Sequence, residues 1–419
     1  MFYCLYPSYV YCVKVLYGNV AEVLIEEILH HGQITRQSLI SKTITKVEHN
    51  IKEKATEKSI SEKLELLMQT RFVEVCLDEQ TETSSADEPP PSKRLKRDGD
   101  CAKDKVCYKV CVSRFNYYHR DLQIVDAVTR RLSPKHGEIM STMLRLAEVK
   151  NSPSALQSSL ISSNEIFNAL PKELGITSRT LLDVYLMTLA DDEMGIIMKA
   201  GDSGGGSYII NYREAVSSLC KASMEAVVLE KFGARSRRLF RLLLLTQHLE
   251  QQKLEEKAMM SSKVVNELLY EMFTEQYITA TEIAKTTDHV PSKTFYCFTV
   301  AVEQLARRLL QNNYQSILNL STKRVQILAD NKRLLEKKQK VDAILATLGE
   351  VEAEQRQEVE EIITPSESQQ LHTVKLQTDR LENGELQLTA STLIWEIHLE
   401  YCTAKRIAEN PKPKGAPKT

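Results

Sequence analysis

The sequence predicts a mainly α-helical fold: tandem winged-helix modules followed by a C-terminal antiparallel coiled-coil hairpin. Glycine, proline and aromatic residues are sparse in this chain of 419 residues, which favours helices over sandwiches or barrels. An order of helices followed by two short strands recurs before residue 300, and this is the order of a winged helix. From residue 300 the chain continues without a proline as far as Pro365, which predicts a very long helix.

Length and composition indicate a protein of several domains. A hydrophobic content of 42% can fill more than one core. The 55 Lys and Arg residues balance 56 Asp and Glu residues, so any nucleic-acid contact must come from local patches. Nine scattered cysteines are typical of reduced thiols in a nuclear or cytosolic protein. Residues 1–18 are expected to be a linker, neither signal peptide nor membrane span, because Pro7 interrupts them and no basic residue precedes Lys14.

The first winged helix is expected over residues 19–118. Val20, Leu24 and Ile28 lie on one helical stripe that ends at Gly32, a predicted C-cap. A second helix follows Thr35, and a third, "SISEKLELLMQT", directs apolar residues inward. "RFVEVCL" and "VCYKVCV" alternate as strands of one hairpin, and the polar, proline-containing insertion between them, residues 79–105, is expected to be disordered.

Two further modules repeat this order over residues 119–211 and 212–299. In the earlier one, Ser162 and Glu165 have the spacing of a capping box that opens a helix. That module ends in "GIIMKAGDSGGGSYIIN", two short apolar strands around a glycine-rich wing. The later module places "ARSRRLFRLLLL", "QQKLEEKAMM" and "SSKVVNELLYEMFTEQ" before a wing with a polar tip.

The coiled-coil hairpin is expected over residues 300–409, followed by a disordered tail at 410–419. Its first arm is predicted to be one long helix that breaks at Thr364 to Ser366. An Asn383–Gly384 pair is expected to interrupt the return arm. Apolar residues recur every seven positions along that arm: Val374, Leu381, Leu388, Trp395 and Cys402.

The string "GDSGG" at residues 201–205 surrounds the nucleophilic serine in trypsin-like proteases. Ser203 lacks the context of a catalytic triad, because no barrel of regularly spaced strands is predicted around it. A phosphate-binding loop would need a helix directly after the glycines, whereas "SYIIN" is predicted to be a strand. The glycines are better explained by positive φ angles at a hairpin tip.

No catalytic, metal-binding or cofactor-binding site is predicted. Cys101, Cys107, Cys111 and His119 lack the paired spacing of a tetrahedral zinc site and are interpreted as core or edge residues. No paired carboxylates or cofactor loop stands out, so the expected function is not enzymatic and no cofactor is expected.

Two clusters of basic residues have two interpretations each: a functional site, or simply a charged surface exposed to solvent. A nuclear-import signal is the favoured reading of "KRLKR" in the expected disordered loop, with Lys93, Arg94, Lys96 and Arg97. A basic start to a leucine-rich helix is consistent with a patch for phosphate or an acidic partner; its members are Arg235, Arg237, Arg238 and Arg241.

Several long segments resemble the third-largest subunit of eukaryotic RNA polymerase III, a winged-helix family related to TFIIE-alpha. They occur in the same order as in that family, over about residues 8 to 403: "RFNYYHRDLQIVDAV", "SSNEIFNALP", "YLMTLADD", "KAGDSGGGSYIIN", "KTTDHVPSKTFYCFTV" and "DNKRLLEKKQKV". The family has four winged helices, whereas this chain begins with "YPSYVYCVKVLYG", which resembles the segment joining the first to the second. A shortened N-terminus is therefore expected.

The resemblance implies a non-catalytic, nuclear subunit in a heterotrimer with two other polymerase III-specific subunits, one winged-helix and one with an acidic tail. That trimer is expected to help open promoter DNA and to recruit the enzyme through TFIIIB at genes for small non-coding RNAs such as tRNA and 5S rRNA. The resemblance further implies binding of single-stranded DNA and a role in cytosolic DNA sensing.

Two hypotheses remain for the winged helices. In one, the second module contacts the backbone of melted DNA through Arg179, Lys199 and the wing glycines Gly204, Gly205 and Gly206. In the other, the modules are a protein-interaction scaffold with no DNA contact. Base-specific readout is not expected under either, because the predicted third helices carry few basic residues.

Overall fold

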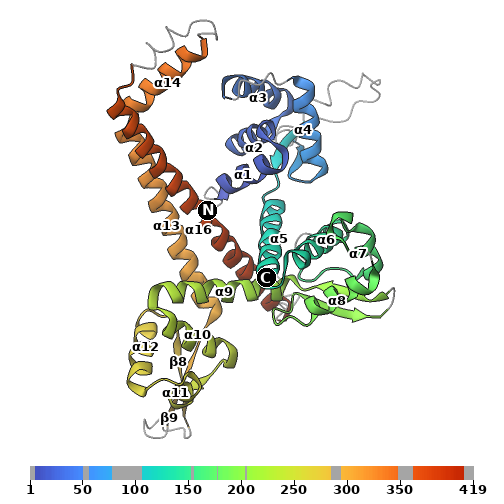
Figure 1. Cartoon of the computed structure of the whole chain (residues 1–419), viewed down its shortest axis with the longest axis vertical. Coiled ribbons are helices and arrows are strands. Elements are labelled where there is room, and N and C mark those ends of the chain that lie inside the picture. Colours follow the sequence, from blue (N-terminus) through green and yellow to red (C-terminus); the bar gives the residue numbers. More distant parts are fainter. Residues whose placement is uncertain are drawn as a thin grey trace, which may run out of the picture. The chain divides into compact units, whose positions relative to one another are not determined.

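The computed structural model describes residues 5–50, 56–77, 106–151, 155–176, 178–202, 205–284, 294–347 and 362–409 (Figure 1). The chain divides into two compact units, Met1–Leu122 and Gln123–Thr419. The first unit contains one winged helix, and the second contains two winged helices and the helical hairpin. No helix in the described ranges is both long and apolar enough to cross a membrane.

The first winged helix has the predicted order. Gly32 ends its first helix with a positive φ of 75°, and its N–H donates to the Ile28 carbonyl over 2.8 Å, so the predicted C-cap is confirmed. Ile60, Leu64 and Leu67 are buried along its third helix. The elements are α2 (Asn19–His31), β1 (Ile34–Thr35), α3 (Arg36–Asn50), α4 (Glu57–Gln69), β2 (Val73–Leu77) and β3 (Val106–Val110).

Two modules of the second unit repeat this order. The earlier one comprises α6 (Pro134–Lys150), β4 (Ile161–Ser162), α7 (Ser163–Ala169), α8 (Arg179–Ala190), β5 (Ile197–Gly201) and β6 (Ser207–Ile210). The later one comprises α10 (Ala234–Thr246), β7 (Leu249–Glu250), α11 (Gln251–Ala258), α12 (Ser262–Thr274), β8 (Thr279–Ala284) and β9 (Thr294–Thr299). The helices and wing strands expected from the sequence therefore form.

The three small sheets share one topology. Their strand orders are β1-β3-β2, β4-β6-β5 and β7-β9-β8, so the last strand of each module is central, and every pairing is antiparallel. The short first strand is thereby joined to the wing in each case. This common order confirms a repeated architecture beneath dissimilar sequences.

A leading helix precedes each winged helix, a feature that the sequence analysis missed. These helices are α1 (Tyr6–Tyr17), α5 (Val112–Arg131) and α9 (Tyr212–Phe232). Gly18 between α1 and α2 and Gly233 between α9 and α10 have nearly the same conformation, with φ of 89° and 86° and ψ near 180°. Because side-chain-bearing residues rarely adopt this conformation, the two glycines set the same bend.

The first eighteen residues were expected to be a linker, but most of them form α1. Tyr9 and Val13 are buried within the first unit. The Tyr9 ring stacks on Phe115 of α5 with centroids 4.8 Å apart, and its hydroxyl donates to Asn116 over 2.5 Å. Apolar and aromatic residues at the start of the chain thus belong to a core.

The helical hairpin differs from its prediction at two points. Its first arm is interrupted at Asn331, between α13 (Val302–Asp330) and α14 (Lys332–Thr347), where one unbroken helix was expected. The return arm, α16 (Pro365–Glu409), runs through Asn383–Gly384 without the expected interruption. It begins at Pro365, as the sequence indicated.

Packing against α13 explains why α16 tolerates Gly384 (Figure 1). Glu385 is buried and its Oε1 lies 3.1 Å from Arg324 Nε on α13. Asn313 donates to Thr392 over 3.2 Å further along the antiparallel pair. These contacts outweigh the cost of about 1 kcal/mol for a glycine inside a helix. Of the predicted seven-residue repeat, Val374 and Trp395 are buried, whereas Leu381, Leu388 and Cys402 are only half-buried.

Several predicted features lie outside the described residues, among them the polar tip of the third wing at 285–293. The others include the insertion at 79–105, the basic cluster Lys93, Arg94, Lys96 and Arg97 within it, and the tail at 410–419.

Candidate nucleic-acid interface

The wing of the second winged helix is built on the hairpin of β5 and β6. Lys199 faces Tyr208 across the hairpin, and the register shifts between Lys199 and Gly201. Gly205 and Gly206 have φ angles of 85° and 110°, which confirms the expected positive φ at the tip. Ser203 and Gly204 lie outside the described residues. The protease-like string is therefore flanked by paired wing strands, as the sequence indicated.

The end of the glycine turn is fixed against the start of α7. The Ser163 N–H donates to the Gly206 carbonyl over 2.9 Å. A Cβ atom at Gly206 would lie 3.2 Å from Tyr208 Cε2, so a larger residue would crowd that buried ring as well as strain the backbone. Gly206 thus permits a close approach between the turn and the buried tyrosine.

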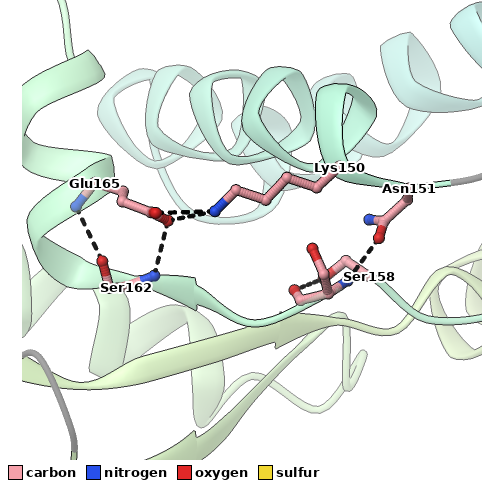
Figure 2. Close-up of polar contacts among 6 residues, drawn as sticks. Lys150, Asn151, Ser158, Ser162 and Glu165 are labelled. Carbon is pink, nitrogen blue, oxygen red and sulfur yellow. Dashed lines mark hydrogen bonds and ion pairs between the residues drawn. The ribbon is translucent and has the colours of Figure 1, made fainter.

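Polar contacts join the end of α6 to the start of α7 (Figure 2). The predicted capping box forms: Ser162 Oγ accepts from the Glu165 N–H, and the Glu165 carboxylate accepts from the Ser162 N–H. Lys150, at the end of α6, places Nζ 2.8 Å from Glu165 Oε2. The hydrogen bond from Lys150 holds the pKa of Glu165 below its usual range. Nearby, Asn151 Oδ1 accepts from the Ser159 N–H over 2.9 Å.

Lys199 is paired with a carboxylate at the wing. Its Nζ lies 2.6 Å from Asp202 Oδ1, and the two side chains are 41% and 90% exposed. Their hydrogen bond raises the pKa of Lys199 and lowers that of Asp202. A surface pair of this kind contributes little stability, so the lysine can exchange its carboxylate for another anion at small cost.

Arg179 opens α8 directly after the capping residue Ser178, whose Oγ accepts from the Leu181 N–H. The Arg179 guanidinium carbon lies 5.8 Å from the centroid of the Phe167 ring, in cation–π geometry. One turn further, Asp183 accepts from Ser163 Oγ over 2.9 Å and contributes to the raised pKa of Lys199. Asp183 of α8 therefore lies near enough to Lys199 of the wing to act on its charge.

The outward face of α8 is apolar, which the sequence analysis did not single out. Leu181, Val184 and Met187 recur every three residues and are all exposed. Their periodicity was visible in the sequence, but only the buried set Leu182, Leu186 and Leu189 shows which stripe faces the core. Apart from Arg179, α8 offers no long cationic or amide side chain for base edges, so base-specific readout is disfavoured.

The arginines of α10 lie on a different module. Arg237 Nε is 3.6 Å from Glu225 of α9, whereas Arg235, Arg238 and Arg241 are exposed. The wing glycines and the α10 arginines therefore belong to two different winged helices and are treated as two separate candidate surfaces.

The predicted core histidine and thiols lie in the first unit. His119 of α5 is 3.1 Å from Ser8 Oγ, and burial lowers its pKa to about 4. Cys107 is buried in β3, whereas Cys101 is outside the described residues. Within the described ranges, no group of three or more His, Cys, Asp or Glu side chains is placed to hold a metal ion.

Repeated winged helices, their leading helices and the terminal hairpin define a tandem winged-helix protein with a helical hairpin. Three family descriptions match consecutive parts of the chain: the RNA polymerase III subunit RPC82 over residues 30–219, the C-terminal winged-helix domain of POLR3C over 224–300, and the helical hairpin domain of RPC3 over 333–394.

Relatives from animals align along almost the entire chain. The DNA-directed RNA polymerase III subunits RPC3 of Danio rerio and Homo sapiens are each 37% identical, over 96% of this chain and 83% and 84% of their own lengths. The corresponding subunit of Dictyostelium discoideum is 23% identical over 52% of this chain and 34% of its own length. The chain belongs to the RPC3 family of DNA-directed RNA polymerase III subunits.

Proposed function

We propose that this chain is a non-catalytic, nuclear subunit of RNA polymerase III that acts with two other polymerase III-specific subunits in promoter opening and initiation. Family membership along 96% of the chain is the observation that carries this proposal. The genes served are those for small non-coding RNAs, including tRNA and 5S rRNA. The proposed association with other subunits is supported by the helix faces and wings of three winged helices, which are the surfaces that such modules offer to partners.

Within this role, the second winged helix contacts the backbone of melted promoter DNA. Arg179 and Lys199 supply the positive charge, and the turn lets the strand approach closely at the exposed Gly205. Support comes from the exposed Lys199–Asp202 pair, in which a phosphate can replace the Asp202 carboxylate. The contact is independent of base identity, because the outward face of α8 is apolar.

Recruitment through TFIIIB and a contribution to cytosolic DNA sensing belong to the same proposal. Both rest on the resemblance to the polymerase subunit and on the proposed affinity for single-stranded DNA.

Oligo-dT binding by the full chain, measured by fluorescence anisotropy across a salt series, tests the DNA contact. The double variant Arg179→Ala/Lys199→Ala is expected to bind more weakly and to lose about 1.4 units of the slope of log affinity against log salt, about 0.7 for each of the two cations. Asp202→Asn is expected to bind more tightly, because Lys199 is then freed from its partner.

A matched control is Lys135→Ala/Lys221→Ala, which removes the same charge from exposed lysines of α6 and α9. It is expected to retain the wild-type salt slope. Equal affinity and slope for the Arg179/Lys199 variant and the wild type would overturn the DNA assignment.

A second candidate function is a protein scaffold without DNA contact. The apolar row Leu181, Val184 and Met187 favours it, because an exposed apolar helix face is typical of protein docking. Val184→Glu separates the two: it should reduce incorporation of the chain into purified polymerase III if α8 docks on protein, and leave incorporation unchanged if α8 only approaches DNA.

A further inference from the structure

Positive charge gathers at the start of α10, where a helix least favours it. The N-cap is Gly233, which has no side chain to accept from the first backbone N–H groups, and the first turn contains no acidic residue. Arg235, Arg237 and Arg238 occupy the first two turns instead. Since the helix dipole is positive at its N-terminus, a cation in the first turn is disfavoured there.

Three of these arginines form an outward set, here called the arginine row: Arg235, Arg238 and Arg241. All three are exposed, and among the described residues none of them has an ion pair within 4 Å. Arg237 is excluded because Glu225 lies beside it. The row is therefore uncompensated by the rest of the described chain.

The fold keeps the arginine row on the surface. Ser236, Leu239, Phe240 and Leu243 of α10 are fully buried, so the helix cannot rotate without exposing its core face. The arginines are spaced by three residues, which spreads them over about 9 Å of the helix axis. Like charges at this spacing repel one another, and the row persists despite that cost. Cations at a helix start run against the usual charge preference, and such a departure on a helix held in place by its core is typical of a binding site.

An anion relieves both sources of strain, because it neutralises the guanidinium groups and complements the uncapped helix start. Guanidinium groups bind carboxylate and phosphate oxygens in bidentate fashion, so these are the chemical classes that fit. The neighbouring surface distinguishes them. Leu245, one turn beyond Arg241, is 73% exposed, and Phe240, the one aromatic residue of α10, is buried.

We infer that the arginine row binds an acidic polypeptide segment in which carboxylates alternate with apolar residues. The carboxylates pair with Arg235, Arg238 and Arg241, and an apolar side chain covers Leu245. A single-stranded nucleic acid fits less well, because it needs exposed aromatic platforms for its bases and a cationic track beyond one helix.

This inference goes beyond the proposed function, since it concerns a helix of the third winged helix and does not depend on DNA binding by the second. The two can therefore fail separately. Loss of oligo-dT binding in the Arg179/Lys199 variant leaves the arginine row untouched.

The test is fluorescence anisotropy of the full chain with a fluorescein-labelled peptide of glutamates interspersed with leucines. The triple variant Arg235→Gln/Arg238→Gln/Arg241→Gln is expected to bind roughly tenfold more weakly. Leu245→Ser is expected to weaken binding less than the triple variant. A peptide with glutamine in place of glutamate should not bind the wild type measurably.

The matched control is Arg333→Gln/Lys338→Gln/Lys340→Gln, which removes the same charge from exposed positions of α14. It is expected to bind the acidic peptide within twofold of the wild type. Equal loss in both triple variants would reduce the row to a general charge effect and overturn the inference. Loss of oligo-dT binding, with peptide binding retained, in the Arg235/Arg238/Arg241 variant would overturn it in favour of a nucleic-acid surface.

Discussion

The second and third winged helices have the same strand order, but two helices at different positions in them, α7 and α10, begin in opposite ways. At α7, Ser162 and Glu165 cap the backbone and Lys150 completes the contact (Figure 2). At α10, Gly233 offers no cap and arginines follow. Cores and turns set the common fold, whereas helix starts and outward faces are free to differ. The start of α7, whose backbone groups are capped, stabilises its module. The start of α10, which is uncapped and carries arginines, is called here the frustrated start and marks the proposed binding surface.

The largest expected effect concerns the buried cores, which both winged helices share. Leu186→Ala in α8 and Leu269→Ala in α12 remove leucines that are almost completely buried. Each is expected to lower the free energy of local unfolding by about 2–5 kcal/mol, because a cavity remains where the side chain packed. Hydrogen exchange of the α8 and α12 amides measures this change in the free energy of local unfolding.

The matched controls are Val184→Ala and Tyr270→Ala on the outward faces of the same helices. These are expected to change local stability by less than about 0.5 kcal/mol. An equal loss at Val184 and Leu186 would contradict the assignment of inner and outer faces.

Sequence patterns predicted the elements well where short-range chemistry determines them. The capping box at Ser162, the C-cap at Gly32 and the wing around the glycines each depend on residues a few positions apart, and each forms as expected. The leading helix α1 was missed because its apolar residues resemble a linker until Phe115 and Asn116 of α5 are placed beside Tyr9.

Long-range packing explains the remaining differences. Asn383–Gly384 is a turn signal in isolation, but the Arg324–Glu385 pair, of which Glu385 is buried, and the α13 surface keep α16 helical there. At the candidate site, the sequence pointed to Lys199 as a positive charge near the wing. Its partner Asp202 lies only three residues away, yet the bend of the hairpin determines whether the two meet.

The capped start gives the next largest effect. Ser162→Ala is expected to destabilise α7 by about 1 kcal/mol, because the Glu165 N–H loses its acceptor. Ser162→Thr retains a hydroxyl and is expected to restore most of that loss. Protection of the α7 amides from hydrogen exchange reports both changes, and equal protection in Ser162→Ala and the wild type would contradict a stabilising role for the cap.

The frustrated start should respond with the opposite sign. Arg235→Glu places a carboxylate in the first turn of α10 and is expected to stabilise the helix by about 0.3–1 kcal/mol. Arg241→Glu is the matched control, since it lies two turns further along, where the helix dipole has little effect. Arg235→Glu should also weaken binding of the acidic peptide. A variant less stable than the wild type would show that Arg235 serves the fold.

The smallest effect is a pH dependence at the capped start. Since Lys150 and the Ser162 N–H lower the pKa of Glu165 in the folded state, the unfolded chain takes up this proton first as the pH falls. The stabilising contribution is therefore complete above the usual carboxyl pKa of 4.5 and is lost as the pH falls below it. It is expected to be no more than about 0.5 kcal/mol, because the Glu165 side chain is 46% exposed and water screens the pair. Glu165→Gln should remove the difference in α7 protection between pH 7 and pH 3, whereas the exposed Glu138→Gln of α6 should retain it. If Glu165→Gln kept the full pH dependence, the response would have to come from other carboxylates, and the capping box would stabilise α7 through its neutral hydrogen bonds alone.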